Sequence, residues 1–121
     1  MAIRVLVADD SALMRKQIRT IVESDAGLEV CAEAANGLEA VQEAEESRPD
    51  VVVIDFLMPG MNGLEATREI KKRMPTLPIL LFTLDDSPQL EWESNHAGAD
   101  AVLPKAEGSR QLSRVIHSLL Q

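Results

Sequence analysis

Short apolar runs alternate along the chain with longer stretches in which apolar residues recur at helical spacing. The runs 51–54 and 79–82 are apolar throughout, which predicts strands buried on both faces, as in a parallel sheet. Residues 28–34 alternate apolar and polar side chains, which indicates an edge strand with one face toward water. The apolar runs 3–8 and 101–103 complete a set of five predicted strands.

A stretch with helical periodicity follows each predicted strand. In the first stretch, Met14, Ile18, Ile21 and Val22 stand at positions i, i+4, i+7 and i+8, which places them on one face of a helix. Turn-forming residues such as Gly, Pro, Asn and Asp separate the elements. Four further helices are predicted, at 38–48, 64–74, 88–97 and 109–120.

Five strand–helix units follow one another without a linker, a repeat or a low-complexity segment, so residues 1–121 are predicted to form a single domain. The alternation predicts an α/β fold in which helices cover both faces of a five-stranded parallel sheet. Right-handed crossovers restrict the topology, and two buried central strands beside an alternating strand favour the order 2-1-3-4-5. The expected fold is therefore a flavodoxin-like (βα)5 three-layer sandwich.

Composition narrows the classes of function. The chain has a net charge of -8, no Tyr and 2% aromatic residues, so we expect no direct binding of nucleic acid through a cationic groove or a stacking platform. Cys31 is the single cysteine, which excludes an intrachain disulfide, and we expect it to be a small buried core residue. Apolar runs are too short to span a membrane and residues 1–8 lack a secretory signal, so we expect a soluble, cytoplasmic protein without a membrane partner.

Chemically active side chains stand where the predicted strands end. Asp9 and Asp10 follow the first strand, Asp55 the third, Thr83 the fourth and Lys105 the fifth. These strands are neighbours in the predicted order, so we expect their polar residues to converge on the rim where ligands of such sheets bind. Taken singly, each residue has an ordinary explanation as a cap, a turn residue, a packing residue or a solvated charge. Their combination at four strand ends points to a site.

The residue types at this rim are suited to phosphoryl transfer. Three neighbouring carboxylates repel one another unless a cation neutralises them, and Mg²⁺ prefers oxygen ligands while keeping room for a phosphate. The Lys105 ammonium and the Thr83 hydroxyl can both contact a phosphoryl oxygen. A carboxylate can form an acyl phosphate, which makes Asp55 the expected nucleophile.

Several motifs occur in one order along the whole chain. They are VLVADDS at 5–11, ANGLEA at 35–40, PDVVVID at 49–55, MPGMNGLE at 58–65, Thr83, and AGAD at 97–100 leading to Lys105. In identity and in spacing this ordered set resembles the response-regulator receiver domains of two-component signalling. Each motif alone is weakly specific, whereas the set is strongly specific.

The resemblance implies a phosphoryl acceptor and a metal site. Asp55 corresponds to the residue that takes a phosphoryl group from a histidine kinase, a phosphotransfer protein or a small acyl-phosphate donor. Asp9 and Asp10, together with Asp55 and the backbone carbonyl of Leu57, correspond to the ligands of Mg²⁺. The implied protein is a signalling domain, not an enzyme with a turnover substrate, because its chemistry is its own phosphorylation and dephosphorylation.

The resemblance also implies a switch and a surface for partners. Thr83 corresponds to the switch hydroxyl, and Lys105 to the lysine that pairs first with the acceptor and later with its phosphate. A downstream effector domain or protein would bind through Leu90, Trp92 and His96 together with the last strand and helix. A homodimer is a further alternative.

Three positions depart from the family pattern. Val102 stands where the family usually has an aromatic residue, so we expect the switch to work through backbone shifts or another residue. Leu84 follows Thr83 where a small residue is usual, so we expect it to shield the phosphoryl group and prolong its lifetime. Ala106 follows Lys105 in place of the usual proline, so we expect a trans peptide bond there.

Alternatives remain for the function and for the effector. Val102 and Leu84 give some weight to a pseudo-receiver, a binding scaffold with weak or no switching, whereas the complete set of Asp, Thr and Lys residues at the rim argues against it. An aspartate phosphatase would need an Asp in place of Leu57, and a flavin carrier would need a phosphate loop and aromatic side chains. Residues 11–15 resemble receivers of the chemotaxis methylesterase type, whereas 29–37 resemble receivers attached to helix-turn-helix DNA-binding domains.

Overall fold

The computed structural model describes residues 1–85 and 87–121, and Ser109 by its backbone alone. One sheet of five parallel strands has the order β2-β1-β3-β4-β5, which confirms the predicted flavodoxin-like sandwich. The strands are β1 Ile3–Ala8, β2 Leu28–Ala34, β3 Val51–Ile54, β4 Ile79–Thr83 and β5 Ala101–Pro104. The helices are α1 Ala12–Glu23, α2 Gly37–Ser47, α3 Gly63–Arg73, α4 Pro88–Ala97, the short 3₁₀ helix η1 Lys105–Glu107, and α5 Gly108–Leu119.

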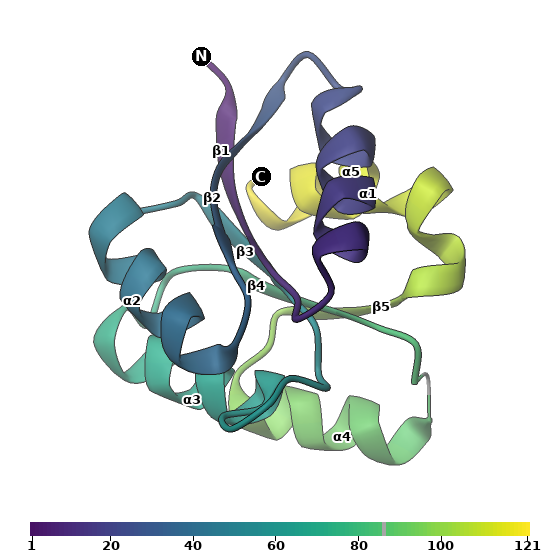
Figure 1. Ribbon diagram of the computed structural model, residues 1–121. Coiled ribbons are helices and arrows are strands. Elements are labelled where there is room, and N and C mark those ends of the chain that lie inside the picture. Colours follow the sequence, from purple (N-terminus) through teal and green to yellow (C-terminus); the bar gives the residue numbers. More distant parts are fainter. Residues whose placement is uncertain (86) are drawn as a thin grey trace.

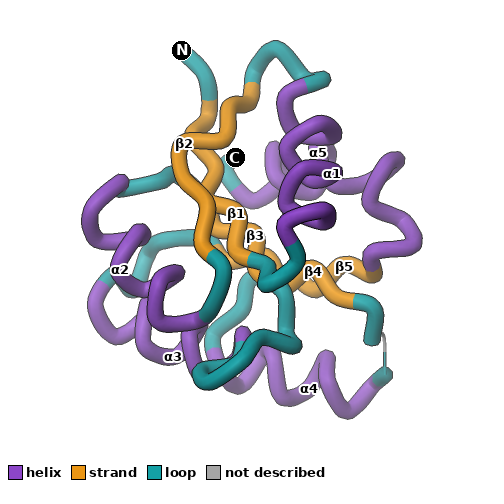
Figure 2. Tube along the Cα trace, viewed as in Figure 1, coloured by secondary structure: helices purple, strands orange, loops and turns teal. Residues whose placement is uncertain are grey.

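The sheet separates two layers of helices. In Figure 1, α1 and α5 lie on one face of the sheet, and α2, α3 and α4 lie on the other. Figure 2 shows the strands as the middle layer between these two sets of helices. Loops that follow the strands at their carboxyl ends therefore meet at one edge of the sheet, as the predicted strand order requires.

Alternating residues of the central strands supply two apolar cores. In β3, Val52 and Ile54 belong to the core beneath α2, α3 and α4, whereas Val51 and Val53 belong to the core beneath α1 and α5. All four side chains are at most 1% exposed. Burial on both faces explains why the strand sequence is apolar throughout and does not alternate. One layer of helices packs on each face of the sheet, and the two layers together hold the strand ends, where the site lies, in fixed relative positions.

Helix boundaries differ from the predicted ones by about one residue because capping side chains set them. Asn36 accepts a hydrogen bond from the backbone N–H of Glu39, so α2 begins at Gly37. Asn62 and Glu65 form a reciprocal capping box, so α3 likewise begins one residue earlier than predicted. The short helix η1 was not predicted, because a single 3₁₀ turn has no periodicity that a sequence reveals.

The edge strand β2 shows one departure from expectation. It lies at the sheet edge as predicted, but Cys31 is half-buried and not a fully buried core residue. The edge position explains the difference, since β2 has a neighbouring strand on one side alone. Partial burial raises the pKa of the Cys31 thiol.

Among the described residues, the helices are all too short or too polar to cross a bilayer.

Gly63 offers a test of how tightly the loop after β3 is packed. A Cβ atom at this position would overlap the backbone carbonyl oxygen of Asp55, which cannot move aside as a flexible side chain could. We expect Gly63→Ala to lower the free energy of unfolding by roughly 2–3 kcal/mol in urea denaturation, as for other overpacked sites.

The matched control is Gly27→Ala, because a Cβ there would lie 3.3 Å from its nearest neighbour, the side chain of Asp25. This control should change stability by about 1 kcal/mol or less. Equal effects of the two substitutions would contradict the close approach at Gly63.

Candidate functional site

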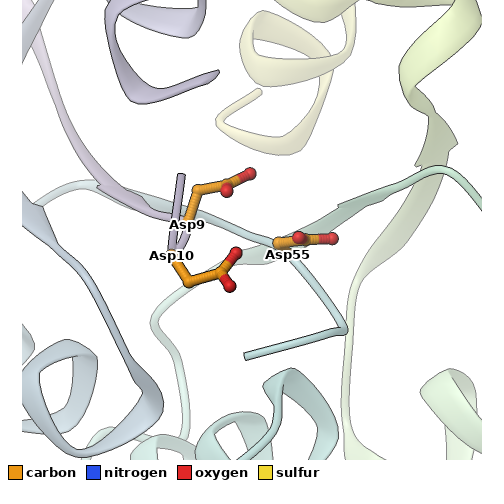
Figure 3. Close-up of side chains that lie close together, drawn as sticks. All are labelled: Asp9, Asp10 and Asp55. Atoms are coloured by element: carbon orange, nitrogen blue, oxygen red, sulfur yellow. The ribbon is translucent and has the colours of Figure 1, made fainter. Parts of the chain in front are cut away.

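The acidic rim, which we define as Asp9, Asp10 and Asp55, lies where β1 and β3 end. These strands are neighbours, and the backbone N–H of Asp55 donates to the carbonyl of Ala8 at 2.9 Å. One carboxylate oxygen from each of the three residues lies within 4.8 Å of the other two. Figure 3 shows the Asp9 and Asp10 side chains extending toward the side on which Asp55 lies. Asp9 is 1% and Asp55 8% exposed, whereas Asp10 is open to solvent.

Lys105 joins the rim from the other end of the sequence. Its ammonium lies 2.8 Å from Oδ2 of Asp9 and 3.3 Å from Oδ2 of Asp55. The Lys105 side chain is 8% exposed, so both contacts are shielded from bulk water. The family resemblance implied Asp55 as the partner of this lysine; that contact is present, and a shorter one is made with Asp9. One ammonium is therefore shared between two buried carboxylates.

The second carboxylate oxygen of Asp9 and that of Asp55 each accept a hydrogen bond from a backbone N–H group. Oδ1 of Asp9 accepts from the N–H of Ser11 at 2.9 Å, and Oδ1 of Asp55 accepts from the N–H of Phe56 at 2.8 Å. These bonds fix the rotation of both carboxylates and direct Oδ2 of each toward Lys105. The buried pair is thus preorganised by its own loops.

Charge at the rim is unbalanced, with three carboxylates beside one ammonium. Burial raises the pKa of Asp55 from its ordinary value, the Lys105 ammonium opposes that rise, and the neighbouring Asp9 carboxylate adds to it. A group of oxygen donors with excess negative charge fits a hard divalent cation such as Mg²⁺.

The other two predicted site residues are Thr83, which ends the strand next to β3, and Leu57, which follows Asp55 by two residues. Thr83 is the last residue of β4 and is 2% exposed, and its hydroxyl oxygen accepts a hydrogen bond from the N–H of Asp85 at 3.3 Å. Leu57 lies in the loop after β3, and its side chain is 67% exposed. The role expected for the Leu57 carbonyl stays a prediction.

The surface expected to bind partners needs one correction. Leu90 is 4% exposed and belongs to the core beneath α2, α3 and α4, so it does not present a side chain to a partner. It was misassigned because α4 is polar over most of its length and shows little periodicity from which its inner face could be read. Trp92 is 61% exposed and stacks on His96, with ring centroids 3.7 Å apart.

The three departures from the family pattern take distinct positions. Val102 is half-buried against the core beneath α2, α3 and α4. Leu84 is 79% exposed beside the buried Thr83. The bond between Lys105 and Ala106 is trans, as expected, like the other peptide bonds of the described residues.

Sequence patterns did not reveal that Arg15 contacts the rim or that Glu33 holds Arg15 in place. The guanidinium of Arg15 donates to the main-chain carbonyl of Asp9 at 2.6 Å and forms an ion pair with Glu33 at 3.1 Å. The spacing of Arg15 and Arg19 by four residues, on the helix that follows Asp9, was the one signal available in the sequence.

The raised pKa of Asp55 predicts how Asp55→Asn changes stability. Because the fold disfavours the ionised carboxylate, the stability contributed by Asp55 is present at low pH and is lost as pH rises through the raised pKa. In the absence of metal at pH 7, Asp55→Asn should therefore raise the thermal midpoint by about 2–6 °C, and this gain should shrink as pH falls toward the ordinary value of 3.8.

Thermal unfolding of both proteins between pH 3 and pH 7 measures this dependence. Asp50→Asn is the matched control, since Asp50 is exposed at the opposite end of β3. An advantage of Asp55→Asn that grows toward low pH would contradict the account.

Comparisons with known proteins agree with this architecture. The family model for the response regulator receiver domain matches residues 5–117. A protein-glutamate methylesterase/protein-glutamine glutaminase of Carboxydothermus hydrogenoformans is 43% identical over 98% of this chain, and one of Pyrococcus abyssi is 56% identical over 49%. This chain covers 34% and 16% of those two proteins.

Solved structures give the same result. A two-component response regulator of the LuxR family from Aurantimonas sp. SI85-9A1 superposes with a TM-score of 0.95 at 32% identity, covering 99% of this chain and 86% of that one. The response regulator domain of Thermotoga maritima CheB superposes with a TM-score of 0.87 at 32% identity, covering 98% and 94%. The chain belongs to the family of response-regulator receiver domains.

Proposed function

We propose that residues 1–121 form one receiver domain that signals by phosphorylation of Asp55, with a histidine kinase or a phosphotransfer protein as the donor. The observation that carries the proposal is the position of the Lys105 ammonium between Asp9 and Asp55 inside the acidic rim. This arrangement combines a carboxylate nucleophile, a fixed positive charge and a group of oxygen ligands, which are the parts that phosphoryl transfer requires.

Asp55 has the surroundings of a phosphoryl acceptor. The adjacent Lys105 favours the ionised, nucleophilic carboxylate and opposes the effect of burial on its pKa. In the transfer, an Asp55 oxygen forms a bond to phosphorus while the bond from phosphorus to the donor's nitrogen or oxygen breaks, and the leaving group keeps that electron pair. Lys105 then exchanges its contact with Oδ2 of Asp55 for one with a phosphoryl oxygen.

The acidic rim would hold Mg²⁺ through Asp9, Asp10 and Asp55, with the backbone carbonyl of Leu57 as a further ligand. The donor set consists of oxygen atoms alone, which suits that ion. When bound, Mg²⁺ supplies positive charge that offsets the repulsion between the phosphoryl oxygens and the carboxylates. The chain itself contributes the fixed orientation of Asp9, whose Oδ1 is held by the N–H of Ser11.

A series of hydrogen bonds supports a route from the site to α4 that needs no aromatic residue at Val102. The Thr83 hydroxyl accepts from the N–H of Asp85, and the Asp85 carboxylate accepts from the N–H of Ser87 at 2.8 Å. The hydroxyl of Ser87 in turn caps α4 by accepting from the N–H of Leu90. A Thr83 hydroxyl that turned toward a phosphoryl group would release the first of these bonds, and the bonds from the Asp85 carboxylate to Ser87 and from Ser87 to Leu90 would pass the change to the start of α4.

The effector that the relatives support best is a methylesterase in the same polypeptide. The curated relatives cited above are methylesterase/glutaminases of which this chain spans about a third or less, so that activity would reside outside the receiver. In this proposal the receiver acts in the cytoplasm and meets its effector through β5, α5 and the exposed pair Trp92 and His96. A pseudo-receiver that binds partners without switching is the competing function.

Phosphorylation can be tested directly by mass. Incubation with Mg²⁺ and acetyl phosphate should add one phosphoryl group to the intact protein, and Asp55→Asn should abolish the addition because the acceptor oxygen is replaced. Asp50→Asn, at the other end of β3, should behave like the parent. An unmodified parent would favour the pseudo-receiver, and an adduct that persists in Asp55→Asn would contradict Asp55 as the acceptor.

The lifetime of the phosphoryl group tests the role of Leu84. If this bulky side chain shields the phosphoryl group from water, Leu84→Ala should shorten the half-life of the phosphorylated protein by a few-fold. The measurement follows the loss of the adduct by intact mass after the donor is removed. Leu13→Ala, another exposed leucine, is the control and should keep the parental half-life. An unchanged or longer half-life in Leu84→Ala would contradict the shielding.

A further inference from the structure

Arg15 contacts the backbone of the acidic rim through its guanidinium. The residue belongs to the first part of α1, and its Nη1 donates to the main-chain carbonyl of Asp9 at 2.6 Å. The Arg15 side chain is 19% exposed, so this contact is sheltered from solvent. The carbonyl that accepts it belongs to the peptide group between Asp9 and Asp10, the two consecutive carboxylates of the rim.

The guanidinium is itself held in place by the neighbouring strand. Nε of Arg15 lies 3.1 Å from one carboxylate oxygen of Glu33, and Arg19 binds the other oxygen at 2.6 Å. Hydrogen bonds from Arg19 first and then from Arg15 lower the pKa of Glu33. In the sheet, Glu33 pairs with Val7, two residues before Asp9. The β2 strand thus anchors Arg15 close to the end of β1.

The Asp9 main chain is bonded on both sides. Its N–H donates to the carbonyl of Ala34 at 3.0 Å, while its own carbonyl accepts from Arg15. Together these bonds fix the plane of the peptide group that leads into Asp10. Asp10 is exposed, and the position of its Cα, from which the carboxylate extends toward the rim, depends on that peptide plane.

We propose that Arg15, oriented by Glu33, is a positioning residue for the divalent-cation site, because it fixes the Asp9–Asp10 peptide and so directs the Asp10 carboxylate toward Asp9 and Asp55. The inference rests on the proposed function, since it deepens the metal site assigned there. Arg15 acts through the backbone and touches neither the ion nor the phosphoryl group. Preorganisation of a ligand by such an outer contact is worth about 10- to 100-fold in metal affinity where it has been removed.

Arg15→Lys separates positioning from charge. Lysine keeps the positive charge, but one ammonium cannot reproduce the fork that reaches both the Asp9 carbonyl and Glu33. We expect Arg15→Lys to weaken Mg²⁺ binding by about 10-fold in calorimetric titration of the whole chain without a phosphodonor. Arg19→Lys is the matched control, since Arg19 binds Glu33 from the same helix, and its side chain contacts Glu23 and Glu33 and not Asp9 among the described residues. It should bind Mg²⁺ within about twofold of the parent.

Arg15→Gln distinguishes a positioning role of Arg15 from a purely electrostatic one, and Glu33→Gln tests whether Glu33 orients Arg15. A purely electrostatic role would make Arg15→Gln bind Mg²⁺ more tightly, because a positive charge near the site is removed, whereas positioning predicts weaker binding. Glu33→Gln should weaken binding less than Arg15→Lys does, because Arg15 keeps its bond to the Asp9 carbonyl but loses its charged anchor. Thermal midpoints measured without metal show whether each variant is folded.

Several outcomes would overturn the inference. They are unchanged affinity in Arg15→Lys, an equal loss in Arg19→Lys, tighter binding in Arg15→Gln, and a parent that does not bind Mg²⁺ at all. Failure of the proposed function is distinguishable from these results. A parent that binds Mg²⁺ with the predicted dependence on Arg15 but takes no phosphoryl group from acetyl phosphate would refute phosphorylation and leave the positioning role in place.

Discussion

The sharing of one ammonium between two buried carboxylates is the interaction on which the site depends. Lys105 contacts Oδ2 of both Asp9 and Asp55, while Asp10 adds a third negative charge at the solvent edge. A buried charge is stable only when it is paired, and one ammonium cannot neutralise three carboxylates. Burial raises the pKa of Asp55, and the neighbouring Asp9 carboxylate adds to that rise. The excess of negative charge at the rim favours an added positive charge.

The fold tolerates this imbalance because the strands beneath the site cannot move apart. β1 and β3 are neighbours at the centre of the sheet, and their side chains are buried against helices on both faces. Around the rim, backbone N–H groups fix one oxygen of each buried carboxylate, and Arg15 fixes the peptide between Asp9 and Asp10. These bonds keep the three carboxylates close together, so the carboxylates do not move apart to reduce their mutual repulsion.

Much of this architecture could be predicted from the sequence because periodicity and strand order decide it. The apolar run of β3 predicted a strand buried on both faces, and the ends of four neighbouring strands predicted where Asp9, Asp55 and Lys105 would meet. The burial of β3 and the meeting of the strand ends depend on where the strands and helices lie in the sequence and on which strands are adjacent. The hydrophobic pattern indicates the positions of the elements and favours one strand order.

Contacts between individual side chains could not be predicted in the same way. The inner face of α4 could not be read because the helix has little amphipathic character, so Leu90 was expected at the surface although it is buried. The closer approach of Lys105 to Asp9 than to Asp55, and the bond from Arg15 to the Asp9 carbonyl, depend on rotamers and loop geometry. A pattern of residue types carries no information on either.

The response of folding stability to Mg²⁺ tests the central claim most directly. We expect Mg²⁺ at 100 times its dissociation constant to raise the free energy of unfolding of the parent by about 2.7 kcal/mol, the value for one ligand bound by the folded state alone. Asp55→Asn, which lacks one carboxylate of the rim, should gain much less, so that its advantage in the absence of metal disappears. Equal gains in the two proteins, or no gain in the parent, would contradict the claim that the charge imbalance at Asp55 is relieved by a bound cation.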